Sequence, residues 1–155
     1  MKLIRATLQD IPSMLSLVAD EVKSGVILDR SADEIATNIR SYTLAKDGNH
    51  LLGYTALHIH SPRLSEIRSL IVDEHHRGKE IGKNIVLSAL KEAKTLDLEE
   101  VLVLTYLPDF FLKLGFREIA KESIPEHKIW ADCIKCIHFP ICNEVSLMYT
   151  IEKQG

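Results

Sequence analysis

The sequence predicts an α+β fold: a mixed, mostly antiparallel sheet of about six to seven strands with helices on both faces. Three strand-like segments in the middle of the chain are joined by connections too short for crossovers, so they should form an antiparallel meander. Apolar residues recur at helical spacing before and after this meander. Residues 101–105 are apolar and β-branched on both sides, which is typical of a strand buried on both faces.

Before the meander, one strand is followed by two helices. Residues 2–7 predict a short opening strand. Asp10 offers an N-cap and Pro12 falls in the first turn, so the spacing of apolar residues predicts a helix over residues 11–23. Ser31 and Glu34 have the spacing of a capping box, which predicts a second, short helix.

The meander and the segments after it complete the sheet. Turn signals at Asp47-Gly48-Asn49 and Ser61-Pro62 divide the meander into three strands, over residues 42–46, 51–60 and 64–72. The later segments are a polar loop, a helix, the buried strand, a short helix with Gly115 as its C-cap, and two strands: residues 73–82, 85–96, 101–105, 110–114, 116–120 and 145–151.

Composition and charge exclude several classes of function. With 155 residues, 46% of them hydrophobic, residues 1–155 are expected to form a single domain with its own core. A net charge of −3 argues against a nucleic-acid-binding groove. No apolar run approaches the ~20 residues of a membrane helix, and the polar N-terminus does not predict a secretory signal. Three cysteines, an odd number, favour a reducing cytoplasm over a disulfide scaffold.

Residues 66–85 carry the most informative pattern. A buried strand leads into a basic, glycine-containing loop that opens directly into a helix. Free backbone N–H groups at a helix start, together with the helix dipole, bind phosphate well. Arg77, Lys79 and Lys83 add positive charge there. The residues alone leave two interpretations open, a phosphate site and a tight turn on a solvated face.

Over nearly its whole length the sequence resembles the GNAT superfamily of acyl-CoA-dependent N-acetyltransferases. Leu70-Ile71-Val72 and the loop over residues 77–82 resemble its pyrophosphate-binding motif, and residues 110–116 resemble its later helix-turn signature. Within the superfamily, the short stand-alone N-acetylglutamate synthases are most similar. The segments that carry this second resemblance are residues 27–31, 66–70, 104–111 and 128–145.

The resemblance implies an enzyme that transfers acetyl from acetyl-CoA to the amino group of L-glutamate, the first step of arginine biosynthesis, by direct transfer. It implies that backbone N–H groups of Leu70, Ile71 and Val72 polarise the thioester carbonyl. It also implies a homodimer. The coenzyme pyrophosphate would be bound by Arg77, Gly78, Lys79, Glu80, Ile81, Gly82 and Lys83. Glu80 is a departure, because the family motif carries glycine at that position and a carboxylate repels a diphosphate.

The reaction also needs a base and an acid. A base must take the proton of the attacking amine, and Glu66 is the candidate because its strand leads to the carbonyl site. The alternative is a carboxylate that simply pairs with Arg68 on the same strand face. Many members of the family carry a tyrosine acid where this chain has Phe111. Tyr106 is the nearest replacement, unless it only packs on Pro108.

Glutamate brings two carboxylates, which guanidinium groups bind with paired hydrogen bonds. Arg30 and Arg68 lie in the synthase-like segments and are the candidate ligands, with Lys128 third. Each could instead be a solvated side chain. In 155 residues we expect no regulatory kinase-like domain.

The remaining histidines and cysteines leave further alternatives open. Cys133, Cys136, Cys142 and His138 could hold a structural zinc ion or remain free thiols beside a histidine. His58 and His60 share a strand face without an acidic partner at metal spacing, and His75-His76 is expected to be an exposed loop pair, so none of these four is assigned a role.

Two other functions compete with glutamate acetylation. One is acetylation of another small amine or a protein N-terminus. The other, suggested by Glu80 and Phe111, is a catalytically silent module that binds acyl-CoA or a partner.

Overall fold

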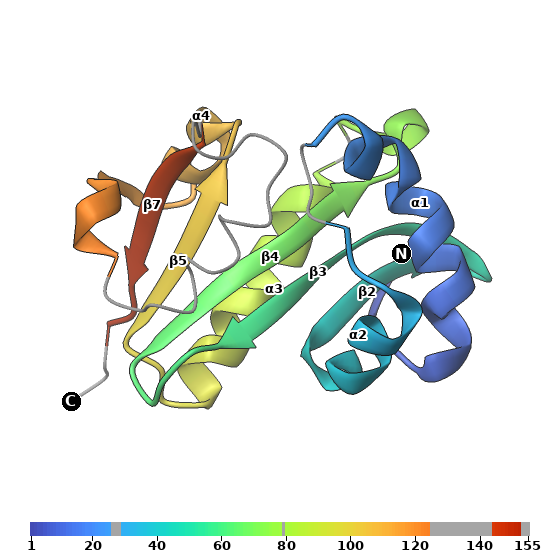
Figure 1. The fold of residues 1–155 in the computed structure, drawn as a ribbon, viewed down its shortest axis with the longest axis horizontal. Helices are drawn as coiled ribbons and strands as arrows, with labels where there is room; N and C mark the ends of the chain where they lie inside the picture. Colours follow the sequence, from blue (N-terminus) through green and yellow to red (C-terminus); the bar gives the residue numbers. More distant parts are fainter. Residues whose placement is uncertain (26–28, 79, 125–143, 153–155) are drawn as a thin grey trace.

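A computed structural model describes residues 1–25, 29–78, 80–124 and 144–152, which form a seven-stranded sheet flanked by helices (Figure 1). The strand order is β1–β2–β3–β4–β5–β7–β6, and every neighbouring pair is antiparallel except β4 and β5. The predicted fold class is confirmed, and so is the predicted order of strands and helices. The strands are β1 (Lys2–Arg5), β2 (Tyr42–Asp47), β3 (His50–Ile59), β4 (Leu64–Val72), β5 (Glu100–Thr105), β6 (Arg117–Ile119) and β7 (Val145–Thr150).

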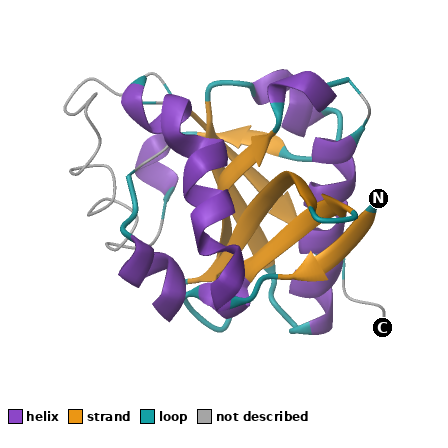
Figure 2. Cartoon of the chain, turned by 90° about the vertical axis from the view of Figure 1, so that its right-hand side faces the viewer, coloured by secondary structure: helices purple, strands orange, loops and turns teal. Residues whose placement is uncertain are grey.

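Helices cover both faces of this sheet (Figure 2). None of the helices among the described residues is both long and apolar enough to span a lipid bilayer. The helices are α1 (Ile11–Lys23), α2 (Ala32–Thr37), α3 (Ile81–Thr95) and α4 (Pro108–Leu112), and the 3-10 turns are η1 (Leu8–Asp10), η2 (Ile39–Ser41), η3 (Glu74–His76) and η4 (Lys121–Ser123).

Each face has its own apolar core because side chains alternate along the strands. On one face, α3 contributes Val86 and Ala89 to a cluster that includes Ile67 of β4 and Val101 of β5. On the other face, α1 and α2 pack on β2, β3 and the end of β4 through a second cluster that includes Met14, Ile35, Tyr42, Tyr54 and Ile71.

Two helix starts test the capping predictions. Ser31 Oγ accepts a hydrogen bond from the Glu34 N–H at 3.1 Å, so the predicted capping box of α2 is confirmed. Asp10 occupies the predicted N-cap position of α1, but its side chain makes no capping hydrogen bond to this helix. The Asp10 carboxylate instead turns back to accept from the Thr7 N–H at 2.8 Å and from Lys46 Nζ at 2.6 Å, which fixes the turn before the helix to β2.

The central feature of the sheet is the separation of its two parallel strands. β4 and β5 pair only over Leu64–Ile67 and Glu100–Val103. Beyond these residues β4 stays with β3 as far as Val72, while β5 stays with β7 as far as Thr105. Residues 69–72 therefore have a backbone edge with no strand partner among the residues described.

A β-bulge in β4 lies where this separation begins. Ser69 adopts φ +56°, the left-handed region, and the register with β3 shifts between Tyr54 and Ala56. The Thr55 hydroxyl donates to the Arg68 carbonyl at 2.9 Å and holds the bulge. After the bulge, Ile71 packs on the α1 side, whereas Leu70 packs on the α3 side. Bulges re-aim side chains and are common beside active sites.

Candidate active site

The start of α3 supplies backbone donors next to the end of β4. Among the described residues, the first α3 hydrogen bond given by a backbone N–H is from Asn84 to the Glu80 carbonyl, at 3.0 Å. The N–H groups of Ile81, Gly82 and Lys83 precede this bond, and the Glu80 side chain does not cap them. A Cβ on Gly82 would lie 3.4 Å from Val72, so the last residue of β4 and the first turn of α3 are in contact. This arrangement fits a diphosphate, because orphan donors and the helix dipole both favour an anion.

The rest of the predicted pyrophosphate loop surrounds this helix start. Arg77, Gly78 and Lys83 are exposed, and Lys79 lies outside the described residues. Glu80 adopts φ +61°, so the carboxylate-bearing residue occupies a backbone conformation that favours glycine. Its side chain is 72% exposed and lies 4.0 Å from Lys83 Nζ, which directs the charge toward solvent.

A buried ionic cluster lies on β4, on the α1 side of the sheet. Glu66 is 6% exposed, and its Oε1 accepts from Arg68 Nε at 2.8 Å and contacts His60 Nε2 at 2.8 Å. Burial raises the pKa of Glu66, but the His60 hydrogen bond and the Arg68 charge outweigh it and hold the pKa below its ordinary value. Glu66 is therefore ionised at neutral pH. His60 therefore has an acidic partner that spacing along the sequence does not indicate, because the turn after β3 brings it back onto Glu66.

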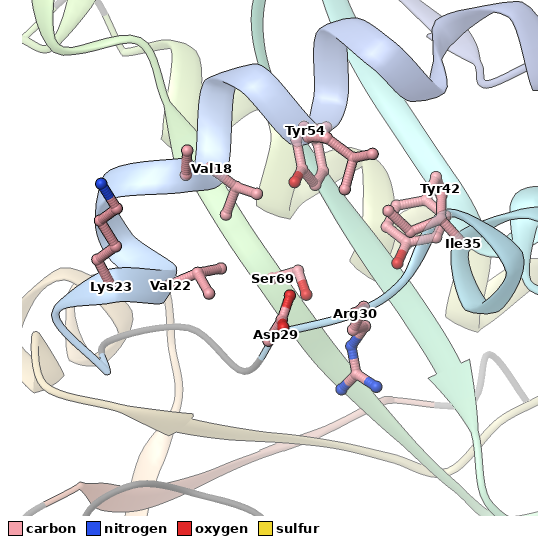
Figure 3. A pocket seen from close by; sticks show the side chains of 11 residues that line it. Val18, Val22, Lys23, Asp29, Arg30, Ile35, Tyr42, Tyr54 and Ser69 are labelled. Carbon is pink, nitrogen blue, oxygen red and sulfur yellow. The ribbon is translucent and has the colours of Figure 1, made fainter.

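A pocket of about 290 Å³ opens on the same side, between α1 and the bulge of β4 (Figure 3). Apolar side chains of α1, including Val18 and Val22, form one wall, and Tyr42 and Tyr54 form another. The polar groups in its lining include Asp29, Arg30 and Ser69. A mostly apolar pocket with a few convergent polar groups is typical of a small-molecule site.

Arg30 and Arg68 both lie near enough to Tyr42 for their charges to influence its pKa. Burial raises the pKa of Tyr42, and the charges of Arg30 and Arg68 partly offset that rise. The side chain of Arg30 is 20% exposed, and its nearest carboxylate oxygen in the described chain, on Glu34, is 3.9 Å away. That distance is too long for a hydrogen bond. Of the two candidate carboxylate ligands, Arg30 lines the pocket, whereas Arg68 lies on β4 next to the lining residue Ser69 and donates to Glu66.

The comparison with known proteins decides the family. The sequence model of the acetyltransferase (GNAT) family matches residues 13–116. An uncharacterized N-acetyltransferase of Chlorobaculum tepidum is 34% identical over 146 residues, which are 94% of each chain. The chain belongs to the GNAT family of acetyltransferases. It is therefore an acyltransferase, and its acyl donor is acetyl-CoA.

Two further proteins are similar to this acetyltransferase. The amino-acid acetyltransferase of Mycobacterium tuberculosis is 32% identical over 118 residues, 74% of this chain and 67% of that protein. The structure of N-acetylglutamate synthase from Neisseria gonorrhoeae complexed with coenzyme A and N-acetyl-glutamate has a TM-score of 0.87 at 18% identity. It covers 98% of this chain, which spans 35% of the synthase chain, and the likeness shows a shared fold.

The two aromatic positions of this GNAT protein lie in different surroundings. Tyr106 directly follows β5 and is partly buried. Phe111 is 3% exposed and packs edge-on between Phe110 and Phe116, with ring centroids 5.0 and 5.3 Å away. Phe111 therefore belongs to the core beneath the site.

Sequence reasoning missed three residues of the site region. Ser69 lies at the bulge of β4, and Asp29 lines the pocket. His60 contacts Glu66 across the turn between β3 and β4. The residue types Ser and Asp gave no signal, whereas His60 could have been paired with Glu66 from the tight turn between β3 and β4. The zinc candidates Cys133, Cys136, Cys142 and His138, as well as Lys128, lie outside the described residues.

Proposed function

We propose that this acetyltransferase transfers the acetyl group of acetyl-CoA to the amino group of L-glutamate. The observation that carries the proposal is that Arg30 lines a pocket beside β4, together with Ser69, the residue that directly follows Arg68. Two guanidinium groups match the two carboxylates of glutamate. The names of the M. tuberculosis and N. gonorrhoeae proteins support an amino-acid acceptor. This reaction would be the first step of arginine biosynthesis.

The donor would lie along the edge of β4 that faces β5, beyond the residues where these two strands pair. In this proposal the N–H groups of Ile81 to Lys83, with Arg77 and Gly78, bind the diphosphate. The thioester carbonyl then lies beside Leu70, Ile71 and Val72, where backbone donors stabilise the charge that develops on its oxygen. The acceptor approaches from the pocket on the α1 side. Its ammonium group would pair with Asp29, which lines that pocket.

Proton transfer falls to Glu66 and Tyr106 in this proposal. The amine of glutamate is mostly protonated at neutral pH and must lose a proton before it attacks. Glu66 is ionised and accepts that proton, directly or through water. Its lowered pKa makes it a weaker base than a free carboxylate, so His60 and Arg68 must adjust as the proton arrives. Tyr106 would protonate the leaving thiolate of coenzyme A.

An acceptor scan tests the substrate. Purified protein is incubated with acetyl-CoA and a panel of amino acids and amines, and the released thiol is measured. Glutamate should give the highest kcat/KM, with aspartate and glutamine lower because one carboxylate is displaced or absent. Thiol release with another amine but none with glutamate would rule out the proposed acceptor.

Arginine variants test how the carboxylates bind. Arg30→Ala and Arg68→Ala should each raise KM for glutamate at least about tenfold, the loss expected for a charged hydrogen bond. An acceptor without carboxylates should not respond to both substitutions. Arg40→Ala, at an exposed arginine of η2, is the matched control and should leave KM unchanged. Equal KM values in all three variants would contradict this binding mode.

A further inference from the structure

Three side chains meet at the base of the proposed diphosphate loop, outside the site described above. His50 is the first residue of β3, Asp73 directly follows β4, and His76 ends η3. One nitrogen of each histidine and one oxygen of Asp73 all lie within 4.8 Å of one another. The cluster connects the β2–β3 turn to the loop between β4 and α3.

The backbone holds the Asp73 carboxylate in one orientation. The Asp73 N–H donates to the Leu52 carbonyl at 2.7 Å, which fixes the residue against β3. Oδ1 accepts from the His75 N–H at 3.1 Å. The other oxygen, Oδ2, therefore faces the two imidazoles. Ligands oriented by such outer contacts are typical of metal sites.

The distances between the donor atoms fit a tetrahedral metal ion. Oδ2 is 3.2 Å from His50 Nε2 and 3.3 Å from His76 Nδ1. Zinc binds nitrogen and oxygen at about 2.0–2.1 Å, so two ligands of a tetrahedron lie about 3.3–3.4 Å apart. Both distances from Asp73 are close to this value, and the two imidazole nitrogens lie within 4.8 Å of each other. His50 is 59% exposed, which leaves room for water at the fourth position.

His76 Nδ1 distinguishes this cluster from a simple ion pair. The atom is buried, and among the residues described it has no hydrogen-bond partner, although Asp73 Oδ2 is 3.3 Å away. The ring is thus not turned to share a proton with the carboxylate. A cation between the two atoms would satisfy both.

We propose that His50, Asp73 and His76 bind one divalent transition-metal ion of the zinc class. Two imidazoles and a carboxylate suit zinc, whereas calcium and magnesium prefer oxygen ligands alone. The ion connects the loop immediately before Arg77 and Gly78 to the start of β3. It supports the fold near the donor site and takes no part in the transfer.

Zinc binding to the full chain tests the proposal. Chelator-treated protein is titrated with zinc chloride by calorimetry and melted with and without the ion. We expect a saturable site whose affinity falls at least about tenfold in His50→Ala and His76→Ala. At about 100 times Kd, zinc should raise the Tm of the wild type by about 5–10 °C, and this rise should be lost in both variants.

Two controls separate this site from other ligands. His75→Ala removes a neighbouring histidine that is 80% exposed and should bind zinc like the wild type. Cobalt substitution reports the ligands, because binding at Cys133, Cys136 and Cys142 would add an intense sulfur-to-cobalt band. His50 is exposed, so its variant should fold even where His76→Ala does not. Unchanged zinc affinity in His50→Ala, or no binding at millimolar zinc, would overturn the proposal.

Discussion

Replacing Glu80 by glycine should both stabilise the protein and tighten its binding of coenzyme A. Glu80 adopts φ +61° and ψ 15° immediately before α3. A left-handed conformation costs an L-residue about 1–2 kcal/mol, and glycine is free of this cost. The unfolded chain of the glycine variant is more flexible, which offsets about 0.4–1 kcal/mol of this gain in folding stability. The net gain of about 0.5–1 kcal/mol should raise Tm by about 1–4 °C.

The charge of Glu80 contributes separately to coenzyme binding. Its carboxylate is 72% exposed, so solvent screens its repulsion of a diphosphate bound at the α3 start. In water two unit charges about 4 Å apart repel by about 1 kcal/mol, which corresponds to at most about a fivefold change in Kd. The gain should shrink as salt is added.

A second variant separates the backbone effect from the charge effect. Glu80→Gln removes the charge and keeps the left-handed strain, so it should tighten coenzyme binding without raising Tm. Thermal melts and calorimetry with coenzyme A at low and high salt measure both quantities. Weaker coenzyme binding in Glu80→Gly, or a Tm below that of the wild type, would refute this account of the α3 start.

Three other substitutions follow from contacts in the sheet. In Gly53→Ala the new Cβ would lie 2.6 Å from the Ile71 carbonyl oxygen, so β3 and β4 must move apart. We expect the free energy of unfolding, measured in urea, to fall by about 1–3 kcal/mol. An unchanged unfolding midpoint would contradict the close approach of the two strands. The pKa of Glu66 is lower folded than unfolded, so its ionised form stabilises the protein above about pH 4.5 and this contribution disappears as pH falls through the folded value. Glu66→Gln should therefore flatten the acid side of a plot of Tm against pH, and should lower kcat about 10²–10⁴-fold if Glu66 is the base. Asp10→Asn should cost about 1–2 kcal/mol through its 2.6 Å contact with Lys46, and a double-mutant cycle with Lys46→Met that gives no coupling would argue against that contact.

Sequence reasoning succeeded where local rules act. The bounds of α1 and β4 are the predicted ones, because helical spacing and turn signals are properties of neighbouring residues. Glu66 and Arg68 were expected on one strand face and lie there, joined at 2.8 Å. The predicted helix over residues 85–96 begins earlier, at Ile81, because nothing in the polar loop indicates that residue 80 already turns into the helix.

Reasoning from sequence failed where distant segments meet. His76 was expected in an exposed pair, but its side chain is 28% exposed because η3 folds back onto Asp73. His60 meets Glu66 through a turn whose geometry the sequence does not specify. Asp10 is drawn away from its own helix by Lys46, 36 residues later in the chain. A charged side chain pairs with an oppositely charged group that the fold brings close to it. The spacing of residues along the sequence does not show which group that is.

The bulge at Ser69 reverses the alternation of β4 side chains between the two faces of the sheet. Counting by twos from Glu66 and Arg68 would place Leu70 and Val72 beside them, yet it is Ile71 that lies on their side of the sheet. Because of the one extra residue, Ile71 lies on the same face of the sheet as Glu66 and Arg68, although it is an odd-numbered position and they are even-numbered. Losing or gaining a single residue here would move the side chains of the last residues of β4 from one face of the sheet to the other.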